Sequence, residues 1–377
     1  MSIILVPANF KTEEIKEYDK LNKRYKDGGL YVKEFYGSLN PSEFGCTKNP
    51  KNLPLVDLKK LKEYNEELKK YDFEFNYILN FLCYGGNEFN KKDIEKIVNF
   101  VKQLKNIGIN KFTIANPVIA NILGNIFDDI KISISVVNNV NTSLKVNTMS
   151  SLKNVERMYI SEDIIRDFDA IKLLKDEATS CNVELSTLLN SFCLIECPYK
   201  TAHANVDGHL IDNKTQDIPH YFYSWCSLQK LKSPTEIMRL QWIRPEDIKL
   251  YEDIGITNFK IAGRELVNCD FLKACEHYMS RSYDGNLMDL LTVFSVNFFN
   301  EIYNIDNKKL DGRLEKIKEY HIRCRDFSNC KNCNICRQFD SAISVNKEKL
   351  NYYRNMFQSS YDNFYNEINK IKEDKDV

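Results

Sequence analysis

Short apolar runs alternate with amphipathic helical stretches through the first 265 residues, and this alternation constrains the fold more than any other feature. We expect strands in the apolar runs at 2–8, 28–39, 73–83, 111–117, 130–137, 157–161, 183–190 and 258–265. We expect helices between them at 11–26, 55–71, 91–109, 169–181 and 244–256. About eight such repeats predict an α/β fold with a closed, TIM-barrel-like (β/α)₈ core.

The C-terminal part of the chain has a different pattern. All nine prolines lie at or before Pro245, and segments 270–283 and 347–374 have helical periodicity. Between these segments lies a cysteine-rich stretch at 324–336. We therefore predict a barrel core at 1–268 and a helical extension at 269–377 that contains this insert.

Composition excludes several classes of protein. The 53 basic and 53 acidic residues cancel, so net charge gives no argument for a nucleic-acid partner. No apolar run is long enough for a membrane span, and the first residues do not resemble a signal peptide. We expect a cytoplasmic protein, in which the twelve cysteines are free core residues, metal ligands or redox groups.

The segment SFCLIECPYKTAH, residues 191–203, follows the expected seventh strand. Cys193 and Cys197 stand where barrel enzymes place their active sites, and His203 and Cys226 follow. Thiolates bind zinc and iron–sulfur clusters. The alternative is a set of scattered buried cysteines, since cysteine is a common core residue.

The segment CRDFSNCKNCNIC, residues 324–336, spaces four cysteines as C-x5-C-x2-C-x2-C. Such short steps let successive thiolates reach one ion or one cluster from a single loop. Iron–sulfur and zinc both fit the spacing, and its compactness favours a cluster. We predict Cys324, Cys330, Cys333 and Cys336 as ligands.

Charged residues mark the ends of two expected strands. Lys260 and Arg264 lie near the end of the last strand, and Glu34 lies in the second. We predict all three as catalytic residues of one pocket, where arginine suits a carboxylate or phosphate. The alternative is that Lys260 and Glu34 form a solvated pair at the barrel rim. Similarly, Asp163, Arg166 and Asp167 are either site residues or only the start of a helix.

Together these segments resemble the collagenase-like peptidase family U32. The resemblance rests on LLNSFCLIECPYKTAH, WCSLQ, WIRPEDIKLYEDIGITNFKIAGRE and YDGNLMDLL, and it spans roughly residues 30–340. It is greatest for the branch with a Cys-x3-Cys-Pro-Tyr-(Arg/Lys)-x-x-His motif and a C-terminal cysteine cluster. Lys200 stands here where arginine is expected.

The resemblance implies a barrel and an iron–sulfur cofactor. Relatives in that branch are similar to proteins of oxygen-independent hydroxylation of ubiquinone and RNA bases, which carry a [4Fe–4S] cluster on four cysteines. By this likeness Cys193, Cys197 and Cys226 are three of the ligands. The fourth is left open among Cys46, Cys181, Cys269, His203 and the 324–336 group.

Three functions follow from these patterns. The first is an iron–sulfur redox enzyme of an anaerobe, with one or two [4Fe–4S] clusters, that modifies a small molecule, an RNA base or a peptide. A partner subunit or electron donor would assist it, and zinc is the alternative at 324–336. The second function is a metal-dependent peptidase, although thiolate-rich sites suit hydrolytic zinc poorly. The third is a scaffold with structural metals.

Overall fold

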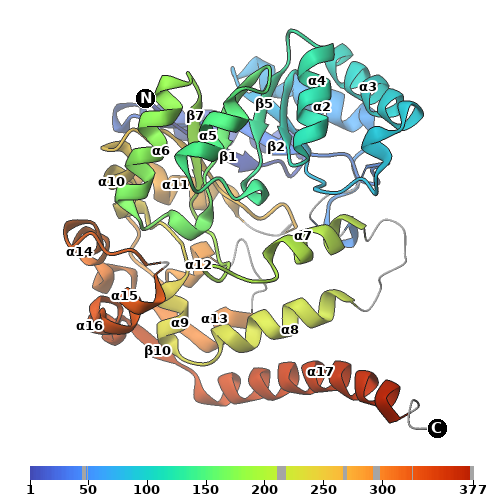
Figure 1. Ribbon diagram of the computed structural model, residues 1–377. Coiled ribbons are helices and arrows are strands. Elements are labelled where there is room, and N and C mark those ends of the chain that lie inside the picture. The colour runs from blue at the N-terminus through green and yellow to red at the C-terminus, as the bar shows by residue number, and fades with distance from the viewer. Residues whose placement is uncertain are drawn as a thin grey trace.

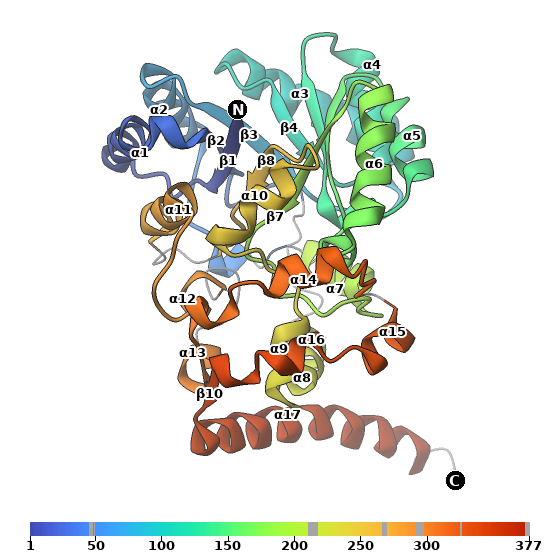
Figure 2. The same ribbon diagram turned by 90° about the vertical axis from the view of Figure 1, so that its left-hand side faces the viewer.

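A computed structural model describes residues 1–44, 48, 50–209, 218–265, 270–291, 298–324 and 326–373. Its first part is a closed barrel of parallel strands in chain order, which confirms the predicted fold (Figures 1 and 2). The strands are β1 Ser2–Pro7, β2 Leu30–Gly37, β3 Glu74–Leu79, β4 Lys111–Ile114, β5 Lys131–Ile134, β6 Val155–Tyr159, β7 Glu184–Leu188 and β8 Asn258–Lys260. β8 pairs with both β7 and β1 and so closes the barrel.

Helices between the strands, together with a helix after the last strand, cover the outside of the barrel. They are α1 Thr12–Arg24, α2 Leu58–Lys70, α3 Lys91–Asn106, α4 Pro117–Ile126, α5 Ser143–Ser150, α6 Phe168–Ser180, α10 Ile248–Glu252 and α11 Phe271–Ser280. Side chains cap the first turns of α2 and α4. Asp57 accepts a hydrogen bond from the Lys60 amide at the start of α2, and Asn116 precedes Pro117 at the start of α4. Asp167 caps α6 in the same way, so the expectation of a helix start there is confirmed.

Between β7 and α10, where the sequence showed only irregular chain, the described residues include three helices. They are α7 Lys200–His209, α8 Ile218–Lys230 and α9 Pro234–Arg239. Their apolar residues lack a simple helical stripe, because these helices contact neighbours on several sides rather than one barrel wall.

The C-terminal extension is mainly helical. It contains α12 Met288–Leu291, α13 Phe298–Ile302, α14 Arg313–Glu319, α15 Phe327–Asn332, α16 Ile335–Gln338 and α17 Lys347–Glu373. A two-stranded antiparallel sheet, β9 Tyr303–Ile305 with β10 Ile343–Val345, was not predicted. The predicted boundary between residues 268 and 269 falls outside the described residues.

The extension and helices α7–α9 together form a lobe at one end of the barrel (Figures 1 and 2). α17 lies along α8, where Ser224 and Ser360 are hydrogen-bonded at 3.1 Å and the Tyr221 and Phe364 rings are 4.7 Å apart. Since α7 follows the carboxyl end of β7, this lobe covers the end of the barrel where such enzymes hold their active sites. None of the described helices is both long and apolar enough to span a bilayer.

Candidate functional site

The loop after β7 carries the first cysteine group. Cys193 and Cys197 lie in this loop, and Cys226 lies on α8. Burial raises the pKa of Cys193 to about 12, and burial also raises the pKa of Cys197. The Cys226 thiol influences both values, so the three predicted ligands lie in one neighbourhood.

Two buried carboxylates that follow β6 hold this loop in place. Lys200 forms ion pairs with Glu162 at 2.9 Å and with Asp163 at 3.3 Å. Ser191 donates to Glu162 at 2.6 Å, and the Glu196 amide donates to Asp163 at 2.9 Å. Burial alone would lower the pKa of Lys200, but the two carboxylates outweigh it and raise that pKa. Lys200 therefore stays charged and fixes the cysteine loop against β6.

His203 and the candidate fourth ligands have different positions. Burial lowers the pKa of His203 to about 4, and its ring stacks on Phe222 at 5.4 Å. A neutral imidazole is the form that binds metals. Cys181 ends α6 before β7 begins, so it lies at the other end of that strand from the cysteine loop. Cys46 and Cys269 lie outside the described residues.

Glu34 of β2 is fully buried in a network of ions. Arg157 donates to both of its carboxylate oxygens at 3.1 Å, Asn76 donates at 3.0 Å, and Lys111 is 3.5 Å away. Burial would raise the pKa of Glu34, but Arg157 and Lys111 outweigh it and lower the pKa. Lys111 also pairs with Glu74 at 2.6 Å. Lys111 and Glu74 are the first residues of their strands, whereas Glu34 and Arg157 lie further along theirs, so the network extends from the amino-terminal end into the barrel interior.

Lys260 and Arg264 lie at the carboxyl end, as predicted. The Lys260 ammonium is 3.8 Å from the centre of the Tyr36 ring and 4.6 Å from that of Tyr159. Burial, reinforced by the charge of Arg264, lowers the pKa of Lys260 to about 7. Arg264 donates to the Ser38 hydroxyl at 3.0 Å. The structure thus places Lys260 and Arg264 near each other at this end, while Glu34 is held by Arg157 and Lys111.

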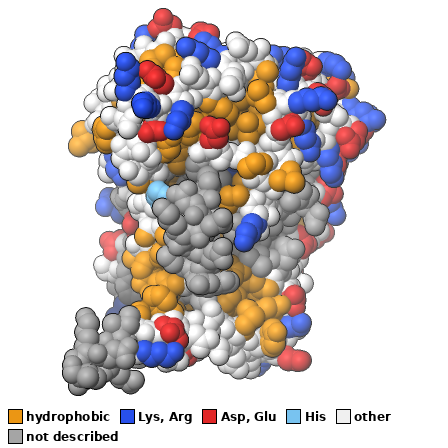
Figure 3. All heavy atoms as spheres, turned by 90° about the vertical axis from the view of Figure 1, so that its right-hand side faces the viewer, with side chains coloured by type: hydrophobic (Ala, Val, Ile, Leu, Met, Phe, Trp, Pro, Cys, Tyr) orange, Lys and Arg blue, Asp and Glu red, His pale blue; other side chains and the backbone are white. Residues whose placement is uncertain are grey.

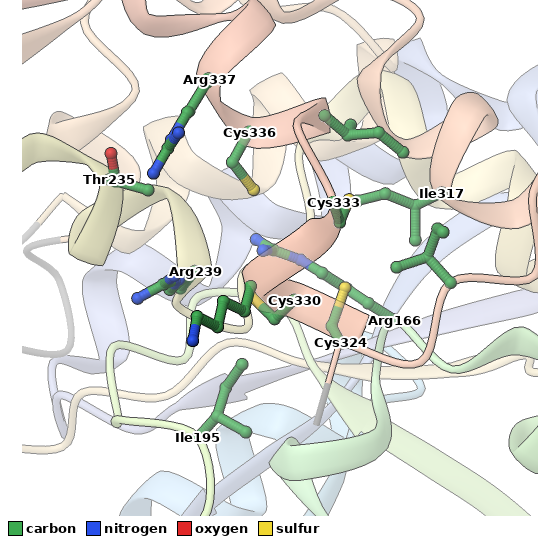
Figure 4. A pocket seen from close by; sticks show the side chains of 13 residues that line it. Arg166, Ile195, Thr235, Arg239, Ile317, Cys324, Cys330, Cys333, Cys336 and Arg337 are labelled. Atoms are coloured by element: carbon green, nitrogen blue, oxygen red, sulfur yellow. The ribbon is translucent and has the colours of Figure 1, made fainter. Parts of the chain in front are cut away.

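The second cysteine group surrounds a cavity of about 100 Å³ in the lobe. Figure 4 shows Cys324, Cys330, Cys333 and Cys336 around this space, with the Arg166 side chain extending between them and Arg239 of α9 nearby. We call this the cysteine pocket. The four predicted ligands thus share one cavity, although they come from α15, α16 and the turns beside them.

Two buried arginines face the cysteine pocket without a carboxylate partner in the described structure. Arg166 is 1% exposed and Arg313 is 2% exposed, and both donate to the Met238 carbonyl at 2.6 Å. Their guanidinium groups lie 4.7 and 4.9 Å from the Trp242 ring. The Nε and Nη2 atoms of Arg166 and the Nε atom of Arg313 make no hydrogen bond. An uncompensated buried cation is costly, and here there are two.

The thiols respond to these charges. Burial would raise the pKa of Cys336, but Arg313, 3.6 Å from its sulfur, and Arg166 outweigh it and lower the pKa. Burial raises the pKa of Cys324 to about 11. For Arg166 itself, burial and the charge of Arg313 lower the pKa to about 10. The cavity is therefore electropositive.

One loop separates the two cysteine groups. Ile195 lines the cysteine pocket, and it lies between Cys193 and Cys197 in the chain. In the part of the chain that the structure describes, no three His, Cys, Asp or Glu side chains converge on a position for a single metal ion.

Sequence reasoning missed several residues of the site. For Arg166 the sequence leaves open a site residue or the start of a helix, and it gives no prediction for Arg313 and Trp242. These three residues lie far apart in the sequence, so no local motif indicates that they meet in the fold. Glu162 was also missed, and its position next to Asp163 after a strand was the signal that could have found it.

Comparisons with known proteins agree with the barrel. The sequence model described as "Peptidase family U32" matches residues 39–195. This chain resembles peptidase family U32 there. It is also 28% identical over 350 residues to "Uncharacterized protease MJ1657" from Methanocaldococcus jannaschii, covering 90% of this chain and 98% of that protein.

A solved structure shares the fold. "The Structure of the U32 Peptidase Mk0906" superposes with a TM-score of 0.50 at 13% identity, covering 70% of this chain and 93% of the other. The U32 match ends within the cysteine loop, after Cys193 and before Cys197. The lobe that holds the cysteine pocket is therefore outside the matched range.

Proposed function

We propose that this chain is an iron–sulfur member of peptidase family U32 that carries out redox chemistry. The reaction would be an oxygen-independent hydroxylation or a related modification of a small molecule, an RNA base or a peptide. The observation that carries this proposal is the cysteine pocket, in which four thiols share a cavity with the buried Arg166, while the buried Arg313 contacts Cys336 from beside it.

Charge balance supports a metal–thiolate group in the cysteine pocket. Each buried arginine without a counter-charge costs the fold several kcal/mol in principle. Four thiolates bring more negative charge than an iron–sulfur core neutralises, so the loaded pocket would be anionic. Arg166 and Arg313 would then be compensated, and the unused Nε and Nη2 groups of Arg166 would find acceptors among the sulfur atoms.

The size of the cavity favours a cluster over zinc. A structural zinc ion gathers its four sulfur atoms at about 2.3 Å from one point. The cysteine pocket instead encloses about 100 Å³, which suits a core of several atoms. Hydrogen bonds and positive charge around the sulfur atoms raise a cluster's reduction potential, and Arg166 and Arg313 are placed to supply both.

The cysteines of the barrel mouth would hold a second cluster. Cys193, Cys197 and Cys226 supply three thiols, and His203 stands in its neutral form in the same region. A cluster with three protein ligands leaves one iron open to substrate, whereas a fully ligated one passes electrons. The cysteine pocket would thus relay electrons across the Ile195 loop to the barrel mouth.

Peptide hydrolysis is the second candidate, and the printed names of the matching family and of the archaeal relative favour it. The thiolate-rich ligand set argues against a hydrolytic zinc site, which normally uses histidine and carboxylate with an open water position.

Anaerobic purification tests the proposal. We expect a brown protein with broad absorbance near ~400 nm that contains iron and acid-labile sulfide in equal amounts. Changing Cys333→Ser together with Cys336→Ser should remove part of the iron, and so should Cys193→Ser together with Cys197→Ser. Cys181→Ser is the matched control, since this thiol belongs to neither group. Stoichiometric zinc without iron, or peptide hydrolysis that survives in both double variants, would refute the proposal.

A further inference from the structure

Lys260 is a partly buried amine at the barrel mouth, and the described structure leaves it without an ionic partner. It is the last residue of β8, and its register beside Leu5 and Leu188 sets it at the carboxyl end of the barrel. Its amine makes no hydrogen bond or ion pair with any described residue, and its side chain is only partly buried, so a small molecule can reach it. The Tyr36 and Tyr159 rings form its walls.

Lys200 at the same mouth provides the contrast. Its amine is paired with Glu162 and Asp163 at 2.9 and 3.3 Å. These carboxylates hold Lys200 in its charged form, in which an amine is not nucleophilic. Of these two lysines at the barrel mouth, Lys200 is held in ion pairs that fix the cysteine loop, whereas Lys260 has no ionic partner among the described residues.

The charged groups around Lys260 favour its neutral form. Arg264 and Arg157 are cations, and Glu34, the nearby carboxylate, is already held by Arg157 and Lys111. Burial raises the pKa of both Tyr36 and Tyr159, so these phenols stay uncharged. The ring faces can hold the ammonium form, and its proton is lost near neutral pH, since the pKa of Lys260 is lowered to about 7.

Arg264 supplies an anion-binding group beside this amine. Its guanidinium uses one neutral hydroxyl, Ser38 Oγ, and pairs with no carboxylate among the described residues. The adjacent acid, Glu265, is taken by Lys48 at 2.8 Å. Arginine recognises carboxylate with two parallel hydrogen bonds, so Arg264 suits a substrate that carries one.

We propose that Lys260 forms a Schiff base with the carbonyl carbon of an anionic aldehyde or ketone, such as a 2-oxo acid, whose carboxylate is held by Arg264. The amine nitrogen adds to the carbonyl carbon, and the carbonyl oxygen becomes a hydroxyl. The nitrogen lone pair then expels this hydroxyl as water as the nitrogen gives up its proton. The products are an imine and one water molecule, and no oxidant or reductant is consumed. This inference does not depend on iron–sulfur chemistry.

Reductive trapping of the wild-type protein tests the proposal without a variant. The protein is incubated with pyruvate and cyanoborohydride at pH 7, and the modified lysines are found by peptide mapping. About half of Lys260 is neutral at this pH, against roughly one in 2,500 for a lysine of ordinary pKa. A less basic amine is also a weaker nucleophile, so we expect Lys260 to be labelled at least ~10-fold faster than surface lysines. Lys200 should remain unlabelled and is the internal control.

A second measurement isolates the role of Arg264. Acetone offers the same ketone without the carboxylate. In Arg264→Gln the ratio of pyruvate to acetone labelling at Lys260 should fall ~10-fold; the ratio cancels any change in the pKa of the amine. Labelling spread evenly over surface lysines, or no labelling of Lys260 in the folded protein, overturns the Schiff-base proposal. An unchanged ratio overturns the assignment of Arg264.

Discussion

The barrel interior and the cysteine pocket both bury arginine, but they treat its charge differently. In the barrel, Arg157 meets Glu34 in a two-fold contact at 3.1 Å, with Lys111 and Asn76 around it. In the cysteine pocket, Arg166 and Arg313 share one carbonyl and lack any carboxylate among the described residues. In the barrel, a carboxylate of the fold itself balances the charge of the arginine. In the cysteine pocket, the arginine charges are balanced only when thiolates or a bound anion supply negative charge.

The surface adds to this comparison. In Figure 3, basic and acidic side chains are mixed over the barrel half, while hydrophobic side chains gather around α8 and α17. Neither half of this face carries an extended patch of one sign, in keeping with the balanced composition.

The largest expected effect comes from removing the balancing carboxylate in the barrel. Glu34→Gln keeps the shape of the side chain but leaves Arg157 buried without its main counter-charge. We expect a loss of roughly 3 kcal/mol in the free energy of unfolding by urea at pH 7. Because the folded pKa of Glu34 is lowered, this contribution exists above the ordinary carboxylate pKa and disappears as pH falls through the folded pKa. Adding Arg157→Met to this variant should recover part of the lost unfolding free energy. If Glu34→Gln is as stable as wild type, the Glu34 carboxylate is not needed to balance the charge of Arg157.

The opposite sign is expected in the cysteine pocket. Arg166→Met removes a buried charge that has no partner, so the metal-free protein should gain about 1 kcal/mol or more in unfolding free energy. The loaded protein should instead bind its metal group less tightly and show a lower reduction potential. Urea unfolding with and without metal, and a redox titration, measure the two effects. A metal-free variant less stable than wild type would show that Arg166 is already compensated.

A smaller effect is expected at Lys260. Its folded pKa of about 7 lies below the ordinary value of 10.5, so the unfolded state binds more protons between these two pH values. Stability therefore rises with pH across this window and is flat below it. Because the side chain is partly exposed, we expect a rise of roughly 1–2 kcal/mol between pH 7 and pH 9. Lys260→Met should abolish the rise, and a rise that persists in this variant would assign it to another group.

The smallest effect is expected at the surface. His321 and Asp169 are 2.9 Å apart, but both are exposed at 71% and 47%. Asp169→Asn should change the unfolding free energy by no more than ~0.5 kcal/mol, because solvent screens such pairs. A loss of unfolding free energy as large as that of Glu34→Gln would mean that burial does not determine how much an ion pair stabilises this protein.

The sequence predicted the barrel because each strand and helix has a local period, from the 2–8 run to the 258–265 run. It brought the four thiols of the cysteine pocket together because these cysteines lie within 13 residues, from Cys324 to Cys336. It failed where the determinant is tertiary. Arg166 and Arg313 meet over Trp242 only in the fold. Glu34 likewise meets Arg157 and Lys111 only once their strands have closed into the barrel.

The most direct test concerns the central claim that the cysteine pocket holds an iron–sulfur cluster. The measurement is the iron and acid-labile sulfide content, with the electron paramagnetic resonance spectrum after reduction, of Cys193→Ser/Cys197→Ser/Cys226→Ser purified without oxygen. This variant keeps only the cysteine pocket as a thiol-rich group among the described residues. We predict iron and sulfide in the amount of one cluster per chain, and a signal from a reduced [4Fe–4S] centre. Folded protein that contains zinc alone, or no metal, would contradict it.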